Sequence, residues 1–280
     1  MALIFFSDIP WESLHQRPQH LAGRLAEATA VLWIEPATLG RRSSFSPVTL
    51  GRNLHGLSLP FIPYNARNRA IRLISRILSR IASLRTFLAL VQGRLLRRTL
   101  RTLGMDQDQL ICVFENFQAL SLISHLRPAM VLYDCIDNPF GFVDFPPHVH
   151  REWHAMLQRA DLLVATSPNL RAVMQSEVAK PVHIVSNGVE YERFAATPAE
   201  RPADLPPQGM PIIGYVGSVY TWLDFDLLRF LCVHAPDLRV VIIGHDHPNC
   251  ARAKLSACSC CCLAAVGSVS RSVLRLMPES

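Results

Sequence analysis

The chain of 280 residues has almost no lysine, no long hydrophobic run and no basic segment ahead of its apolar start. Of its 28 lysines and arginines, only Lys180 and Lys254 are lysines. No run reaches the roughly 20 apolar residues of a membrane-spanning helix. Residues 1–6 are apolar, but Ser7 and Asp8 follow at once, which excludes a typical secretory signal. We therefore expect a cytoplasmic protein whose cysteines stay reduced.

The positive charge is concentrated in one segment. Arg67–Arg101 contains ten arginines and no acid, and the rest of the chain has 18 basic and 22 acidic side chains. Arg69, Arg72, Arg76 and Arg80 are spaced to share one helix face, with aliphatic residues on another. Such a helix suits an anionic membrane surface, although an ordinary surface helix has the same pattern. Nucleic acid is disfavoured because no aromatic residues interleave to stack on bases.

Short apolar segments alternate with segments of helical periodicity along most of the chain. The apolar segments, interpreted as strands, cover residues 2–6, 30–36, 54–62, 109–115, 129–134, 162–167 and 182–187. Apolar strands that alternate with helices indicate a parallel sheet covered on both faces. We therefore predict an α/β fold with a Rossmann-like N-terminal domain. No G-x-G-x-x-G sequence follows the first strand, which disfavours a dinucleotide-dependent oxidoreductase.

A proline-rich stretch divides the chain. Residues 195–209 hold four prolines and few apolar side chains, which is typical of a linker. We expect a domain at 1–194, this linker, the start of a second Rossmann-like domain at 210–247, and an aberrant, disordered tail at 248–280. The second domain is then incomplete, and such a fragment buries too little apolar surface to be stable alone.

The tail is rich in cysteine. Five of the eight cysteines lie within Cys250–Cys262. One interpretation is a soft-metal site at Cys258–Cys262. The other is a shifted reading frame, in which leucine codons are read as cysteine codons. We favour the second, because adjacent cysteines cannot readily surround one tetrahedral ion and the usual two-residue gaps are absent.

Polar residues gather where the predicted strands end. In doubly wound sheets, ligands bind at the carboxyl ends of the strands, where helix N-termini point into the crevice. The first such turn places Trp11, Arg17, Gln19 and His20 around the opening of a helix. This set favours an anionic or hydroxyl-rich ligand, and a plain capped loop is the alternative.

Two further turns carry candidate residues. Asp134 ends the strand at 129–134 and Asp137 follows it, and one of the two carboxylates would serve as a base toward a sugar hydroxyl. Capping of a turn explains the same residues equally well. Asn187 and Gly188 end the strand at 182–187 and suit the positive φ of a tight turn.

The motifs together resemble a known family. The sequences "QRPQHLAGRLA", "VLYDCIDN", "ADLLVATSPNL", "SNGVEYERF" and "IIGYVGSVYTWLDFDLL" occur in this order between Leu3 and Gly244. In this combination the chain resembles GT-B glycosyltransferases of the family 4-like group, and bacterial members that act in surface polysaccharide assembly in particular.

The resemblance implies transfer of a sugar from a nucleotide-sugar donor to a glycan or lipid-linked acceptor, without a cofactor or bound metal. His150 and His154 are one helical turn apart, but no cysteine or acid completes a metal site with them. The implied residues are Asp134 and His20 for catalysis, Trp11, Arg17, Gln19 and Asp137 for the acceptor, and Gly217, Ser218, Asn187 and Gly188 for the donor.

The chain departs from the family in two places. No lysine or arginine follows Gly217 at the point where many relatives neutralise the donor phosphate. After Gly244 the strands and paired glutamates of the donor domain are missing. We therefore expect weak or absent transfer by this chain, which works in the cytoplasm or at the inner face of the membrane. A non-catalytic module that binds a glycan or lipid-linked acceptor is the alternative.

Overall fold

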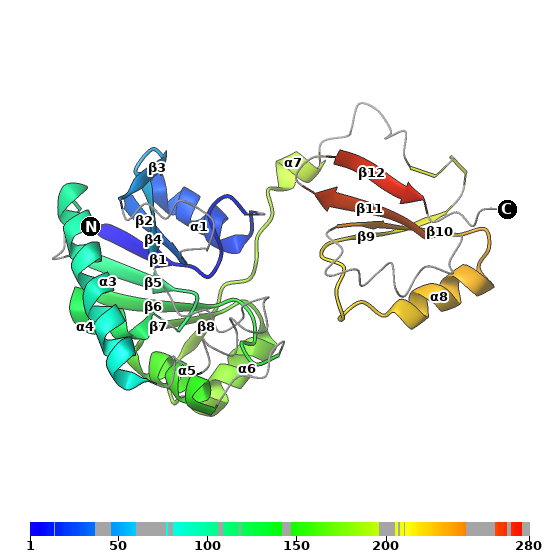
Figure 1. The fold of residues 1–280 in the computed structure, drawn as a ribbon. Coiled ribbons are helices and arrows are strands. Elements are labelled where there is room, and N and C mark those ends of the chain that lie inside the picture. Colours follow the sequence, from blue (N-terminus) through cyan, green and yellow to red (C-terminus); the bar gives the residue numbers. More distant parts are fainter. Residues whose placement is uncertain are drawn as a thin grey trace. The chain divides into compact units, whose positions relative to one another are not determined.

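The computed structural model describes residues 1–13, 15–36, 46–59, 77, 81–105, 109–117, 119–141, 147–195, 205–206, 208–209, 211–244, 261–267 and 270–275. The chain divides into two compact units, Met1–Val189 and Glu190–Ser280 (Figure 1). The division precedes the predicted end of the first domain, residue 194, by five residues.

Unit 1 is built on an eight-stranded sheet in the order β3-β4-β2-β1-β5-β6-β7-β8. The strands are β1 Ala2–Phe6, β2 Ala30–Pro36, β3 Val48–Gly51, β4 Leu54–Leu59, β5 Leu110–Phe114, β6 Met130–Cys135, β7 Leu162–Ala165 and β8 Val182–Ile184. Neighbouring strands are parallel, except that β3 runs antiparallel to β4 at one edge. The predicted α/β fold with its Rossmann-like parallel sheet is confirmed.

β1 shows why the strands are continuously apolar. All five of its residues are buried, and successive side chains point to opposite faces of the sheet. Ile4 and Phe6 pack in one core cluster together with Leu96 and Leu100 of α3. Phe5 packs in a second cluster that includes Ala22 of α1. Both faces of the sheet are therefore covered, and neither can carry polar side chains at its centre.

The helices of unit 1 alternate with its strands, as the segments of helical periodicity predict. They are α1 Arg17–Ala26, α3 Ala82–Thr102, the 3-10 turn η1 Leu120–Leu122, α4 Ile123–Leu126, α5 Pro147–Arg159 and α6 Pro168–Glu177. α6 begins after Ser167, whose hydroxyl accepts the backbone N–H of Leu170 at 3.2 Å. The predicted basic face formed by Arg69–Arg80 lies outside the described residues. Within the described ranges, no helix is long and apolar enough to span a bilayer.

Unit 2 contains a four-stranded sheet in the order β12-β11-β10-β9. Its elements are α7 Tyr191–Ala195, β9 Ile212–Val216, α8 Phe225–His234, β10 Arg239–Ile243, β11 Cys261–Gly267 and β12 Ser270–Arg275. The strands β9, β10 and β11 are parallel, and β12 is antiparallel to β11. Val219, Phe225, Leu228, Val240 and Ile242 form its small buried core.

The structure differs from the predicted disordered tail at two segments. β11 pairs with β10, and β12 pairs with β11. The apolar sequence of β11 suits a strand, and β10 offers it an edge of unpaired backbone groups. Cys112 and Cys135 are free and buried.

Candidate active site at the carboxyl edge of the first sheet

Polar side chains from four strand ends meet at one edge of the sheet in unit 1. Because β1, β5, β6 and β8 are parallel, their carboxyl ends lie at the same edge. Glu115 follows β5, Asp134 lies near the end of β6, and Ser186 and Asn187 follow β8. Arg17, the first residue of α1, reaches across this edge from the side of β1.

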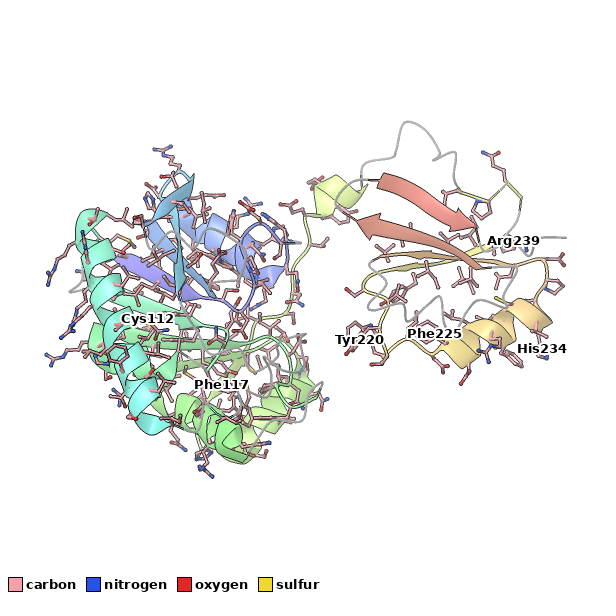
Figure 2. The ribbon with its side chains drawn as sticks, in the orientation of Figure 1. Cys112, Phe117, Tyr220, Phe225, His234 and Arg239 are labelled. Atoms are coloured by element: carbon pink, nitrogen blue, oxygen red, sulfur yellow. The ribbon has the colours of Figure 1, made fainter. Side chains whose placement is uncertain are left out.

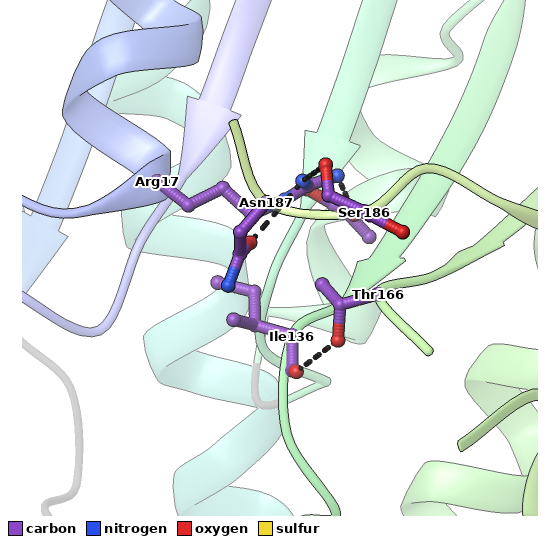
Figure 3. A network of polar contacts seen from close by, with 6 residues as sticks. Arg17, Ile136, Thr166, Ser186 and Asn187 are labelled. Carbon is purple, nitrogen blue, oxygen red and sulfur yellow. Dashed lines mark hydrogen bonds and ion pairs between the residues drawn. The ribbon is translucent and has the colours of Figure 1, made fainter. Parts of the chain in front are cut away.

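Arg17 and Asp134 form a buried bidentate ion pair. The Nε of Arg17 lies 2.9 Å from Oδ2 of Asp134, and its Nη2 lies 3.0 Å from Oδ1. The two side chains are only 8% and 3% exposed. The Nη1 of Arg17 also donates to the Ser186 carbonyl at 3.1 Å and to Oδ1 of Asn187 at 3.4 Å (Figure 3). One guanidinium thus ties together α1, β6 and the segment after β8.

This pairing changes what Asp134 can do by itself. Both carboxylate oxygens accept hydrogen bonds from Arg17, whose guanidinium forms a bidentate, charge-assisted contact with the carboxylate. A hydroxyl that is to give its proton to Asp134 must share or displace one of these bonds. Removal of either partner leaves a buried charge without compensation, which typically costs about 3–5 kcal/mol.

Glu115 is a member of this edge that the sequence analysis missed. Burial raises the pKa of its carboxyl to about 9; the charges of Asp134 and Asp8 act in the same direction, while a hydrogen bond with Ser7 and the charge of Arg17 oppose them. At neutral pH this carboxyl is therefore protonated. Its Oε1 is buried and has no hydrogen-bond partner in the described part of the chain. A lone acid after a strand carries no distinctive spacing, so no sequence signal pointed to it.

Gln19 holds the loop after β1 in place. It is 1% exposed, and its Nε2 donates to the Ser13 hydroxyl at 3.2 Å and to the Pro10 carbonyl at 3.4 Å. Its Oε1 accepts the N–H of Gln16 at 3.1 Å. The amide predicted to contact the acceptor is thus engaged within the loop.

Trp11 lies in the same loop, and His20 lies on the helix that follows it. The backbone N–H of Trp11 donates to Oε2 of Glu35 at 2.6 Å, and its indole packs edge-on against buried Trp33. His20 is exposed on α1, with its ring 6.0 Å from that of His15. Within the described residues no polar contact joins His20 to Asp134, so these two predicted catalytic residues are not brought together.

The remaining candidates of unit 1 face solvent or serve local contacts. Asp137 is exposed, and its carbonyl oxygen accepts a weak hydrogen bond from the Cys135 thiol at 3.4 Å. Gly188 is exposed next to Asn187, and a Cβ added to it would meet nothing within 4 Å.

The histidines of α5 make other contacts. The ring of His150 stacks on Phe140 with a centroid distance of 3.7 Å. The Nδ1 of His154 lies 3.5 Å from Oε2 of Glu177. Among the residues that the structure describes, no three side chains of histidine, cysteine, aspartate or glutamate gather as metal ligands.

In unit 2 the predicted donor residues follow β9. Gly217 has φ 156°, and its N–H donates to the Ile243 carbonyl at 2.9 Å. A Cβ on Gly244 would lie 1.7 Å from the Gly217 oxygen, so only glycine fits at position 244. Ser218 is exposed, and its carbonyl accepts the Tyr215 hydroxyl at 3.0 Å. The chain thus turns sharply at the carboxyl end of β9.

The helix that follows this turn is already capped. Oδ1 of Asp224 accepts the N–H of Asp226 at 3.1 Å and of Leu227 at 2.9 Å. These amides, like that of Gly217, are not free to bind a phosphate in this conformation. The cap is itself an anion, so it occupies the position that a phosphate takes at an uncapped helix start.

We compared the chain with protein families and with known proteins. No family model matches the chain. A protein of Bacillus subtilis (strain 168), provisionally named the teichuronic acid biosynthesis glycosyltransferase TuaH, is 27% identical over 153 residues. The match covers 49% of this chain and 38% of TuaH, so the chain corresponds to well under half of that relative.

Solved structures match over nearly the whole chain. Sucrose-phosphate synthase from Thermosynechococcus elongatus matches with a TM-score of 0.57 and 14% identity, over 96% of this chain and 71% of that one. HepE from Anabaena, solved in complex with UDP and glucose, matches with a TM-score of 0.59 and 12% identity, over 95% and 69%. The chain has the fold of the GT-B glycosyltransferases. The resemblance read from the sequence motifs is therefore confirmed at the level of the fold.

Proposed function

We propose that this GT-B chain belongs to a glycosyltransferase that moves a sugar from a nucleotide-sugar donor to a glycan or lipid-linked acceptor in bacterial surface polysaccharide assembly. The observation that carries the proposal is the polar edge formed by Arg17, Asp134 and Glu115 at the carboxyl ends of parallel strands, where such folds bind ligands. The similarity to TuaH and the UDP and glucose bound to HepE support the choice of substrates.

The proposed reaction requires a base for the acceptor hydroxyl. The acceptor hydroxyl loses its proton while its oxygen bonds to the anomeric carbon, and the bond from that carbon to the nucleoside diphosphate breaks, so that the diphosphate leaves with the electron pair. Asp134 is the proposed base, with the proton passing to the carboxylate oxygen that Arg17 releases. His20 is the second proposed proton acceptor. Trp11 and Asp137 contact the acceptor, and Gln19 keeps the loop that carries Trp11 in place.

The donor side is proposed for unit 2 and the segment before it. Gly217 and Ser218 form the turn at the end of β9, and Asn187 and Gly188 precede the division between the units. Asn187 is bound to Arg17, so a donor that engages Asn187 competes with this contact. No cofactor or metal ion is part of the proposal.

Donor turnover tests the proposal. The full chain is incubated with UDP-glucose and, separately, with other nucleotide sugars, with and without lipid-linked acceptors extracted from bacteria. We expect release of nucleoside diphosphate that rises when an acceptor is added and falls at least tenfold in Asp134→Asn. Arg24→Lys, an exposed arginine of α1 paired with Glu27, is the matched control. Equal release by Asp134→Asn and the unchanged chain contradicts the assignment of the base.

A peripheral membrane location is part of the proposal. Along the exposed side of α3, Phe87 and Val91 are 61% and 39% exposed, and they are followed by exposed Arg94, Arg98 and Arg101. The spacing of four and three residues keeps them on one stripe, and the helix contains no acidic residue. Apolar and basic side chains on one stripe suit the headgroup region of an anionic membrane at the cytoplasmic face.

A second candidate function follows because the polar groups of the proposed site already have hydrogen-bond partners within the chain. Asp134 is fully paired, and the amides at the start of α8 are capped, so the chain in this conformation suits holding a ligand more than turning it over. A non-catalytic module that binds a glycan or lipid-linked acceptor has this property. Measurable binding of an acceptor together with no release of diphosphate from any donor would favour it.

A further inference from the structure

The outward side of α8 in unit 2 is apolar. Phe225 and Leu228 of this helix are buried in the core of the unit. On the other side of the helix, Leu227, Phe230 and Val233 are 53%, 55% and 69% exposed. Figure 2 shows α8 along one side of the sheet of unit 2, with Phe225 at its start. We call Leu227, Phe230 and Val233 the outer α8 face.

A helix of this kind calls for a cover on both sides. A helix on the surface of a globular protein normally turns polar side chains outward, whereas a helix that is apolar on both sides is buried. The residues of the outer α8 face are spaced three apart, so they form one row along the helix. Contiguous exposed apolar surface marks an interaction site. Neither the donor side nor the acceptor side of the proposed function uses this face.

The charged groups beside the face argue against a lipid partner. Asp226 is 93% exposed, and its Oδ1 lies 3.6 Å from Nη1 of Arg229. The imidazole of His234 stacks on Phe230 with a centroid distance of 4.0 Å. An anionic membrane attracts clusters of lysine and arginine, and it would repel the Asp226 carboxylate. The face therefore suits a protein surface that is apolar and carries charges of both signs.

The sequence of α8 makes the face complementary to itself. Leu227 and Val233 each lie three residues from Phe230, and Asp226 and His234 each lie four residues from it. A twofold axis beside Phe230 reverses the direction of the helix in a second copy. Apolar residues then meet apolar residues, and Asp226 of one copy lies toward His234 of the other. Twofold contacts, in which one patch meets itself, are the commonest contacts in homo-oligomers.

We propose that the outer α8 face binds the same face of a second copy of this chain, so that two α8 helices cross about a twofold axis beside Phe230. Phe230 lies at the centre of this contact, where large aromatic side chains contribute most to binding. Asp226 fixes the direction of the second helix, because a parallel arrangement would bring this carboxylate close to its own copy. The contact is independent of the proposed sugar transfer and goes beyond it.

Analytical ultracentrifugation of the full chain over a wide range of concentrations tests the contact. We expect a reversible equilibrium between the single chain and a pair of chains. Phe230→Glu places a charge at the centre of the contact and should raise the dissociation constant of the pair at least about tenfold. Phe87→Glu is the matched control, because Phe87 of α3 is 61% exposed and lies outside this face, and it should leave the dissociation constant unchanged.

An exchange of charges tests the direction of the two helices. His234→Glu places a negative charge opposite Asp226 of the other copy and should weaken the pair. Addition of Asp226→Lys to this variant restores opposite charges and should recover most of the affinity. A double variant that pairs no better than His234→Glu alone contradicts the antiparallel arrangement. Far-ultraviolet circular dichroism establishes that each variant is folded.

The remaining outcomes concern the identity of the partner. A single chain at every concentration overturns the proposal. A pair that Phe230→Glu leaves intact, or that Phe87→Glu weakens equally, overturns it as well, since the outer α8 face is then not the specific contact. If the chain stays single and sediments with phosphatidylcholine vesicles in a way that Phe230→Glu abolishes, a lipid covers the face and the proposal is wrong.

Discussion

The neutral carboxyl of Glu115 predicts an unusual dependence of stability on pH. Its pKa is raised from 4.5 to about 9 in the folded chain, chiefly because the carboxyl is buried. Between these two values the folded state keeps a proton that the unfolded state releases. Stability contributed by this group is therefore fully present below about pH 4.5 and is lost progressively as the pH rises toward 9.

The magnitude follows from the same shift. One bound proton changes the free energy of unfolding by at most about 1.4 kcal/mol per pH unit. Over the roughly three units from pH 4.5 to 7.5, the loss is up to about 4 kcal/mol. Glu115→Gln keeps the shape of the side chain and cannot ionise, so this loss should disappear. The variant should equal or nearly equal the unchanged chain near pH 5 and exceed it by about 2–4 kcal/mol near pH 8.

Urea unfolding at pH 5, 6.5 and 8 measures this difference. Tryptophan fluorescence reports mainly on unit 1, which contains Trp11, Trp33 and Trp153. Glu27→Gln, an exposed acid on the surface after α1, controls for the loss of one carboxyl. If the curves for Glu115→Gln and the unchanged chain stay parallel across this pH range, the carboxyl is not buried in its neutral form and the reasoning is refuted.

Three further predictions concern single contacts. Arg17→Ala should lower the free energy of unfolding of unit 1 by about 3–5 kcal/mol in urea unfolding. The double variant Arg17→Ala, Asp134→Ala should lose less than the sum of the two single variants, because it leaves no unpaired charge. Losses that simply add would argue against the ion pair. Gly244→Ala should lower the melting temperature of unit 2, measured by circular dichroism, because the added Cβ clashes with the backbone of Gly217. Gly214→Ala is the control: its Cβ would meet nothing within 4 Å, so this variant should remain folded. In liposome sedimentation at low salt, replacement of Phe87 by serine should weaken binding to anionic vesicles; no pelleting of the unchanged chain would contradict the membrane proposal.

Much of the fold was predictable because its cause is local. The apolar segments at 2–6 and 30–36 form β1 and β2, since a strand buried on both faces needs apolar residues at every position. β3 was missed because most of its residues are exposed at the sheet edge, which leaves no continuous apolar run. β11 and β12 were missed because these strands are defined by their pairing with a neighbouring strand and not by alternation with helical segments.

The candidate site divides in the same way. The sequence by itself determined that polar residues such as Arg17 and Asp134 lie near strand ends, because the pattern of neighbouring apolar residues locates the strands. Only the tertiary structure decided that these two, 117 positions apart, bind each other and that Gln19 turns inward. It also decided that an oxygen of the Glu115 carboxyl is buried and that this carboxyl keeps its proton. Burial and charge pairing depend on which distant segments pack together, and no local pattern of residues encodes that.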